Sequence, residues 1–541
     1  MSRKVTQLIL PFSNLSENRK ESFTKEMERA ALFCLEELER NKGGGLILKQ
    51  SPEKTVFLAQ AGYPLWLMPW SEQNLIFDGL AITSHRLTYA GIPDVKGFTE
   101  NLERSVKAQE TYMDFLSDNM NYFEQPGNQN ETLFNGLITD PELLNDLTVY
   151  LSEATQAEAL SSGMAILAPT LDESAISSVI QELDSLKSKF QEDLDTLCAN
   201  IKLINKFTSN WIKIIRSKIK TIQAEFREQI KKQEDIVKPK VKHIQEEYDE
   251  QITQLTRNFE KRFLPMRKEK VRLEKLQDQT LAKIERCTIE AKTAKANKNT
   301  VGEKNWKEKL EENKKNLSDT KKRIKEAEAK LKETEDQKSV EVFRLRSESE
   351  TKIKEARKDI VELEATRDAK VQVHEQEIKK LNELTSTLIG QIDKTAKLRE
   401  ANLATIEKFG IKQKLKTSAL FFVPFYLAYY QSEPKRRYTL FPPSFVNSVG
   451  FLVKLRGALG GAKIKHLLVP RFKTLSSFLN QFPALIEKNA AIEREVHETL
   501  AKADLLKSKS TLESTRKGLE QLNVEGWFSE KEYETFKQML T

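Results

Sequence analysis

The stretch AKANKNTVGEKNW, residues 294–306, interrupts a long region rich in Lys and Glu. It lacks the apolar residues that recur at three- and four-residue spacing on both sides of it. It also contains Asn297, Asn299 and Gly302, which are residue types that favour turns. Because the same stretch separates two regions with a helical pattern, we expect a reversal of the chain here.

A helix start signal follows the turn, since Thr300 and Glu303 have the spacing of a capping box. The flanking stretches, about 186–297 and 303–410, are nearly equal in length, and Thr170 with Glu173 matches another capping box at the beginning of the region. Equal helical arms around a turn predict an antiparallel hairpin.

Apolar residues in the arms recur in the manner of coiled-coil seams. In the second arm they fall seven residues apart, at Leu310, Leu317, Ile324 and Leu331, and later at Val371, Ile378 and Ile392 with Leu381 and Leu388. Pro239 and Pro265 lie in the first arm, where each removes a backbone donor and is expected to kink or break the helix.

The hairpin explains an apolar run that arrives late in the chain, ALFFVPFYLAYY at 419–430. If the arms return to their starting point, this run lies beside the strand-like residues 55–70 and completes a small antiparallel sheet. We expect Trp66, Trp70, Phe425 and Tyr426 to share one core. Charge agrees with this docking, because residues 1–185 hold 14 Lys and Arg against 27 Asp and Glu, whereas residues 411–541 hold 21 against 12.

The predicted fold is therefore predominantly α, with a long antiparallel coiled-coil hairpin inserted in a small mixed α/β head built from both chain ends, plus C-terminal helices. The expected domains are four. Residues 1–169 form the N-terminal half of the head, 170–410 the hairpin with its turn near 297–303, 411–474 the C-terminal strands and a basic stretch, and 475–541 the C-terminal helices.

Composition argues for a cytoplasmic protein without export or membrane insertion. The apolar run that Pro11 ends is too short for a signal peptide, and residues 419–430 are too few to span a bilayer. The three cysteines, Cys34, Cys198 and Cys287, have neither disulfide nor zinc-ligand spacing. We expect no cofactor and no metal.

No phosphate-binding GxxxxGK[ST] motif occurs, so nothing in the sequence predicts nucleotide chemistry. Asp78, His85 and Arg86 fall close together, and a catalytic cluster in a pocket of the head is one interpretation. An exposed hairpin turn is the simpler one, and we expect a protein that is not an enzyme.

A basic amphipathic stretch, residues 454–473, is the candidate for binding an anionic surface, either nucleic acid or a membrane. Its simpler role is to pack on the sheet and face the acidic N-terminal half. The candidate residues are Lys454, Arg456, Lys463, Lys465, Arg471 and Lys473.

The last 25 residues, 517–541, predict a helix that ends at Gly526 and a short final helix that begins with a capping box of Ser529 and Glu532. This segment resembles the SHOCT family of short helical hairpins. The resemblance implies an interaction or oligomerisation module without catalytic residues, and rests on Leu519, Leu522, Gly526, Phe528, Glu532, Tyr533, Lys537 and Leu540.

Two functions remain open from the sequence. The first is a non-enzymatic scaffold that binds protein partners, or itself, through the coiled coil and the C-terminal helices. The alternative is a structural protein associated with a membrane surface or nucleic acid through its basic stretch and coil.

Overall fold

The computed structural model describes residues 5–42, 51–124, 127–156, 163–412, 417–433, 435–450 and 462–540. Residues 46–49, whose apolar sequence LILK predicts a short strand, lie outside these residues. The chain divides into two compact units, one made of Met1–Asn205 with Thr385–Thr541 and the other of Lys206–Leu384. The first unit is a mixed α/β head built from both chain ends, and the second is helical.

Two long strands form the centre of the head. Strand β3 (Lys54–Trp70) pairs antiparallel with β10 (Ala419–Ser432) over nearly its whole length, with Ala419 opposite Leu67 and Tyr429 opposite Phe57. The late apolar run thus completes a sheet that begins early in the chain, as predicted from the hairpin.

The expected antiparallel pairing holds for β3 with β10, but the central sheet as a whole is mixed. Strand β1 (Thr6–Ile9) pairs parallel with β10, and β9 (Met164–Ile166) pairs parallel with β3. These strands are only four and three residues long. The other strands of this sheet are β4 (Gln73–Asp78), β7 (Leu137–Ile138), β8 (Thr155–Gln156) and β11 (Lys435–Phe441).

Two small sheets flank the central one. Strand β12 (Ser444–Val446) lies between β2 (Ser13–Leu15) and β13 (Leu468–Pro470), so it also joins the two chain ends. Strands β5 (Ser84–Ala90) and β6 (Gln129–Asn135) form an antiparallel pair.

Side chains of β3 and β10 are buried on both faces of the sheet, which is why both strands are almost continuously apolar. Successive side chains of a strand point to opposite faces. Phe425 and Tyr426 therefore lie in separate core clusters, while Trp66 and Trp70 belong to a third. The expectation that these four residues share one core is wrong.

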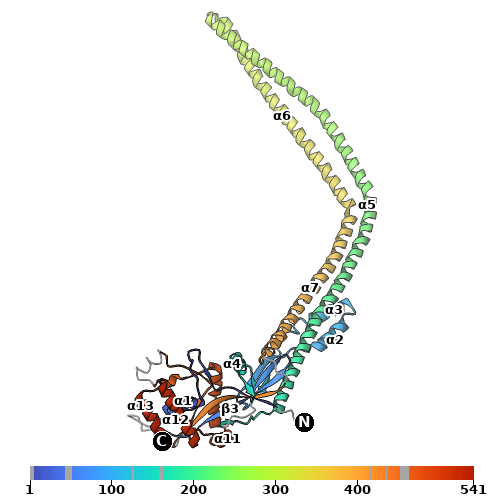
Figure 1. Cartoon of the computed structure of the whole chain (residues 1–541). Helices are drawn as coiled ribbons and strands as arrows, with labels where there is room; N and C mark the ends of the chain where they lie inside the picture. The colour runs from blue at the N-terminus through green and yellow to red at the C-terminus, as the bar shows by residue number, and fades with distance from the viewer. Residues whose placement is uncertain are drawn as a thin grey trace. The chain divides into compact units, whose positions relative to one another are not determined.

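Helices cover both faces of the head sheet. Helix α1 (Lys25–Glu39) packs with α12 (Lys509–Val524) and α13 (Glu530–Met539) in one core cluster, and these helices lie together in Figure 1. The other helices of the head are α2 (Val95–Ser105), α3 (Gln109–Asp118), α4 (Pro141–Leu151), α9 (Lys473–Leu479), α10 (Phe482–Lys488) and α11 (Ala490–Leu500), with a 3-10 turn at Lys463–His466.

The arms are helix α5 (Glu173–Ala296) on one side of the turn, and α6 (Thr300–Ala356) with α7 (Lys358–Ile406) on the other. Within the helical unit α5 and α6 run side by side and antiparallel (Figure 1), with Lys270 paired to Glu328 at 2.9 Å. The predicted antiparallel helical hairpin is thus confirmed. The structure assigns the first 33 residues of α5, up to Asn205, and α7 from Thr385 onward to the head.

Both capping boxes expected in the hairpin are wrong by one or two residues. Asn299 caps α6, because its side chain accepts from the Gly302 amide, and Asp172 accepts from the amide of Ala175 at the start of α5. Asn and Asp are strong N-cap residues, so they replace the threonines that the box pattern favoured.

Neither proline ends a helix, since α5 runs through both Pro239 and Pro265. The interruption lies in the opposite arm, at Arg357 between α6 and α7. Gln233 donates to Asp359 at 3.1 Å, and Lys352 lies over the ring of Tyr248. These contacts place the interruption opposite the part of α5 that contains Pro239.

The seam of α5 does not keep a seven-residue period throughout. From residue 222 to residue 266 its half-buried and buried residues follow steps of four, four and three, which is an eleven-residue repeat. Such a repeat, 3.67 residues per turn, is nearer to a straight helix than a heptad is. The residues are Ile222, Phe226, Ile230, Gln233, Val237, Val241, Ile244, Tyr248, Ile252, Leu255, Phe259, Phe263 and Met266.

Candidate functional site

Arg399 fixes the roots of the two arms within the head. Its side chain is only 2% exposed, and its Nε donates to Oδ2 of Asp193 on α5 at 2.9 Å. A second guanidinium nitrogen donates to the backbone carbonyl of Ala90 on β5 at 2.9 Å, and the group lies 4.7 Å from the ring centroid of Phe190. One side chain on α7 therefore links α5 and β5, and its charge is neutralised where it is buried.

Helices α2 and α3 support the same roots. The Tyr112 hydroxyl donates to the carbonyl of Ile204 at 3.1 Å, and the Thr99 hydroxyl donates to the Asn200 side chain at 3.0 Å. The Gln391 amide donates to the carbonyl of Met120. Buried and half-buried hydrogen bonds therefore hold both arms where they join the head.

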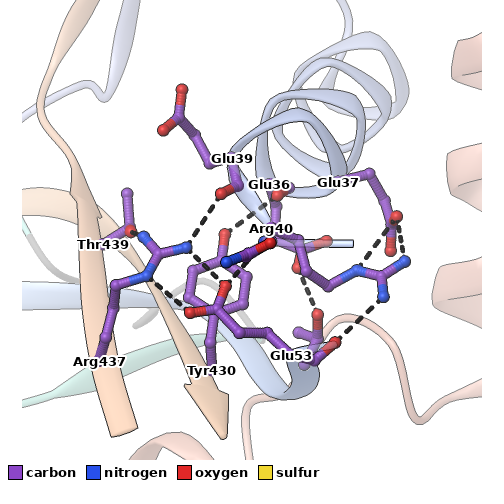
Figure 2. Close-up of polar contacts among 10 residues, drawn as sticks. Glu36, Glu37, Glu39, Arg40, Glu53, Tyr430, Arg437 and Thr439 are labelled. Atoms are coloured by element: carbon purple, nitrogen blue, oxygen red, sulfur yellow. Dashed lines mark hydrogen bonds and ion pairs between the residues drawn. The ribbon is translucent and has the colours of Figure 1, made fainter. Parts of the chain in front are cut away.

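A second polar cluster joins the two halves of the chain where α1 ends (Figure 2). Arg437 on β11 makes a two-pronged ion pair with Glu53, at 3.0 and 2.7 Å, and also donates to the Glu39 carbonyl at 2.9 Å. Its guanidinium lies over the ring of Tyr430, 4.4 Å from the centroid. Paired, planar geometry of this kind makes Arg437 a link between β11, the residue that precedes β3 and the end of α1.

Glu36 is the most deeply buried carboxyl group of this cluster, with no exposed surface. The Thr55 hydroxyl donates to one of its oxygens, while Oε2 has no hydrogen-bond partner among the described residues. Burial raises the pKa of Glu36 to about 7, and the neighbouring Glu37 adds to this effect. The cluster thus holds a proton near neutral pH.

The C-terminal helices pack against α1, and their predicted capping box at Ser529 and Glu532 is confirmed. Arg19 pairs with Glu525 at 2.6 Å beside them. Gly518 lies so close to α1 that a Cβ atom would come within 1.9 Å of the Glu26 carbonyl oxygen. Their apolar side chains are buried in this contact, at Leu519, Leu522, Trp527, Phe528, Phe536 and Leu540.

Asp78, His85 and Arg86 do not form a catalytic cluster. Asp78 is buried and accepts hydrogen bonds from the Tyr63 hydroxyl and from the backbone amides that follow it, which shapes the turn after β4. The His85 ring bonds to Thr139 at 2.7 Å, and burial lowers its pKa. Arg86 is exposed and pairs across the strands with Glu131. Each side chain has its own structural contacts.

A cavity of about 230 Å³ lies near His85, between the start of α4 and the helices α9 and α10. Its polar lining consists of side chains without a free cation or nucleophilic pair, namely Thr83, Ser84, Thr139, Asp140, Thr474, Ser477 and Gln481. The Asp140 carboxylate accepts hydrogen bonds from the first backbone amides of α4, so its role is to cap that helix.

Part of the basic stretch, residues 454–473, makes contacts within the head. Lys454 and Arg456 lie outside the described residues. Arg471 is buried, pairs with Glu153 and lies over the rings of Tyr150 and Phe472.

The remaining lysines of the stretch differ in their surroundings. Lys463 donates to the Gly526 carbonyl at 3.2 Å, and Lys465 lies 3.9 Å from Glu39. Lys473 is exposed. The contacts of Arg471 and Lys465 with N-terminal carboxylates agree with the simpler role expected for this stretch.

Among the described residues no group of His, Cys, Asp and Glu could hold a metal ion. Cys34, Cys198 and Cys287 are free thiols. No helix in the described part of the chain is both long and apolar enough to cross a membrane.

Sequence reasoning missed Arg399 and Glu36, although both stand at positions where the helical pattern predicts a buried apolar residue. Arg399 continues the seam that passes through Leu388 and Ile392, and Glu36 follows Leu32 by one turn of the buried stripe of α1. A charged residue at a seam position requires a partner, and that requirement is the available signal.

Comparisons with known proteins add no family. A scan against protein-family models gives no match, and neither does a search of curated proteins. One solved structure, a computationally designed three helix bundle, aligns with 42% of this chain and 99% of its own length at 18% identity. Its TM-score of 0.11 is too low for any conclusion about this chain.

Proposed function

We propose that this chain is a non-enzymatic, cytoplasmic scaffold whose helical hairpin binds protein partners. The observation that carries the proposal is the anchoring of both arms in the head through Arg399 and the buried bonds of α2 and α3. A hairpin held by such contacts where it begins and ends is suited to present the exposed surfaces of its helices to a partner. The free thiols of all three cysteines support a reducing compartment.

The C-terminal helices have a structural role in this proposal before any partner role. We propose a SHOCT-type hairpin, supported by the turn at Gly526 (φ 87°) and the capping box of Ser529. The apolar side chains of α12 and α13 already cover α1, so a partner would contact the opposite, outer face of these two helices.

The test compares the intact chain with one whose arms are shortened in register. Removing residues 266–286 and 314–334 takes 21 residues from each arm, or about 32 Å at ~1.5 Å per residue, and keeps the native turn. The deletion preserves the heptad spacing on both sides.

A photo-crosslinking amino acid at Phe343, an exposed arm position, reports contacts in the cells of origin. We expect the intact chain to crosslink to a defined protein or to a second copy, and the shortened chain to lose this product. The proposal would be overturned if the purified intact chain had catalytic turnover and the shortened chain kept it.

A further inference from the structure

The turn of the hairpin carries a concentration of lysine side chains. Residues 289–309 contain six lysines against three glutamates, and all six lysines are exposed. They are Lys292, Lys295, Lys298, Lys304, Lys307 and Lys309. We call residues 289–309 the tip.

The lysines of the tip are poorly neutralised. Lys307 pairs with Glu303 at 2.6 Å, and Lys309 lies 4.7 Å from the centroid of the Trp306 ring. In the described part of the chain no carboxylate lies within ion-pair distance of the other four. Farther along the arms lysines pair between helices, as Lys270 does with Glu328. The tip therefore keeps a positive field that the arms partly cancel.

Two exposed aliphatic side chains accompany this charge. Val301 is 71% exposed directly after the turn, and Ile289 is 58% exposed near the end of α5. Neither contributes to the seam between the arms. Basic residues interleaved with exposed apolar ones are the combination that binds the surface of an anionic bilayer, where lysines meet lipid headgroups and apolar groups enter the interface.

The residue types favour lipid over nucleic acid. Between residues 287 and 322 the chain contains lysine but no arginine. Arginine is the residue that reads bases and grips phosphates with two bonds, whereas lysine acts as a point charge. Exposed Val and Ile add affinity for a bilayer and none for a phosphate backbone.

We propose that the tip docks on an anionic lipid surface, which goes beyond scaffold function and does not depend on it. The lipid contact then lies in the turn of the helical unit, between α5 and α6. Each lysine near such a surface contributes roughly fivefold to partitioning, and the contribution decreases with salt.

The experiment measures co-sedimentation of the full chain with phosphatidylcholine vesicles that contain or lack phosphatidylserine, at low and high salt. The tip variant is Lys295→Gln, Lys298→Gln and Lys304→Gln together. Its matched control makes the same charge change on the arms, at Lys238, Lys240 and Lys354. All six positions are exposed, and circular dichroism confirms that both variants remain helical.

We expect binding that requires phosphatidylserine, weakens with salt, and falls at least tenfold in the tip variant but less than threefold in the control. Val301→Ser should reduce the binding that remains at high salt. Equal losses in tip variant and control would overturn the proposal.

Two further outcomes would also overturn it. One is loss of binding on changing Lys465 and Lys473 to Gln, which would assign the lipid contact to the C-terminal basic stretch. The other is release from vesicles by duplex DNA, with DNA binding lost in the tip variant, which would make the tip a nucleic-acid site.

Discussion

At the scale of residues, two arginines join separate parts of the head, Arg399, which is buried, and Arg437, which is half-buried. Arg399 and Arg437 each satisfy a carboxylate, a backbone carbonyl and an aromatic ring. Pairs such as Arg344 with Glu341 are exposed on the arms, where solvent screens them and each contributes little. Removing one partner of a buried pair is costly because the other charge is left unpaired.

Glu36 makes the stability of the head depend on pH. Its pKa in the folded chain is about 7, above the usual 4.5, so the folded state binds this proton more tightly than the unfolded state does. The resulting stabilisation is complete below pH 4.5 and is lost as the pH rises through 7, a difference of roughly 3 kcal/mol.

The variant Glu36→Gln resembles the protonated acid and cannot ionise. We expect it to be more stable than the parent at pH 8 and similar to it at pH 5, measured by urea unfolding followed by tryptophan fluorescence. Glu39→Gln is the control on the exposed side of the same helix end. The prediction would be contradicted if the difference in free energy of unfolding between the parent and Glu36→Gln were the same at both pH values.

Such residues lie beyond sequence reasoning for a physical reason. Glu36 and Arg399 stand in regions full of Glu and Arg, and only tertiary contacts decide which copy is buried. The turn after β4 shows the same difficulty. Asp78 lies near His85 in the sequence and so suggested a catalytic cluster, but its carboxylate accepts hydrogen bonds from backbone amides of the turn.

At the scale of elements, periodicity and turn signals predicted the long helices well. Lost apolar spacing and the Asn/Gly cluster located the hairpin turn, which the structure places at residues 297–299. Of the two outcomes expected at the prolines, a kink or a break, the break does not occur, because a long helix supported by a partner arm tolerates the hydrogen bond that each proline removes. The short strands β1, β8 and β9 were missed, since two to four residues contain too little pattern to distinguish them from loops.

The contact of α12 with α1 gives a test at this scale. Gly518→Ala should destabilise the head by about 1 to 3 kcal/mol, because the new Cβ would overlap the Glu26 carbonyl and force the helices apart. Gly390→Ala is the matched control within α7, where a Cβ meets nothing within 4 Å. Alanine favours helix, so the control should gain about 0.5 to 1 kcal/mol. Equal effects of both changes in urea unfolding would show that α12 does not sit tightly on α1.

The register of the arms is testable with a native thiol. Asn313 on α6 donates to the sulfur of Cys287 on α5 at 3.7 Å. In a Cys198→Ser background, Asn313→Cys should form a disulfide with Cys287 within one chain under mild oxidation, which changes migration on a non-reducing gel.

Cys34 does not interfere with this experiment, because burial raises the pKa of its thiol well above the usual value. Lys315→Cys, which faces away from the seam, is the control and should leave the two thiols free. Disulfides found only between two chains would replace the hairpin by an intermolecular coiled coil.

At the scale of the whole molecule, the head is an early fold that a late segment finishes. Equal arms predicted that the chain ends would meet, and the pairing of β3 with β10 confirms it. The sequence could not show that the α12–α13 hairpin covers α1, because its apolar stripe fits equally well on a foreign partner. The close approach at Gly518 and the shared core cluster of α1, α12 and α13 distinguish the two.

The division into two units predicts that the head folds without most of the hairpin. A chain in which a short Gly/Ser linker replaces residues 206–384 should be soluble, and its head should unfold within a few degrees of the parent transition. The reason is that Arg399 and its partner Asp193 both remain, as do β3 and β10. Residues 1–205 alone should aggregate instead, because β3 then exposes a long apolar edge that invites pairing with other chains. An insoluble excised chain beside a well-folded 1–205 fragment would mean that the N-terminal half completes its own core and that β10 is an addition to it.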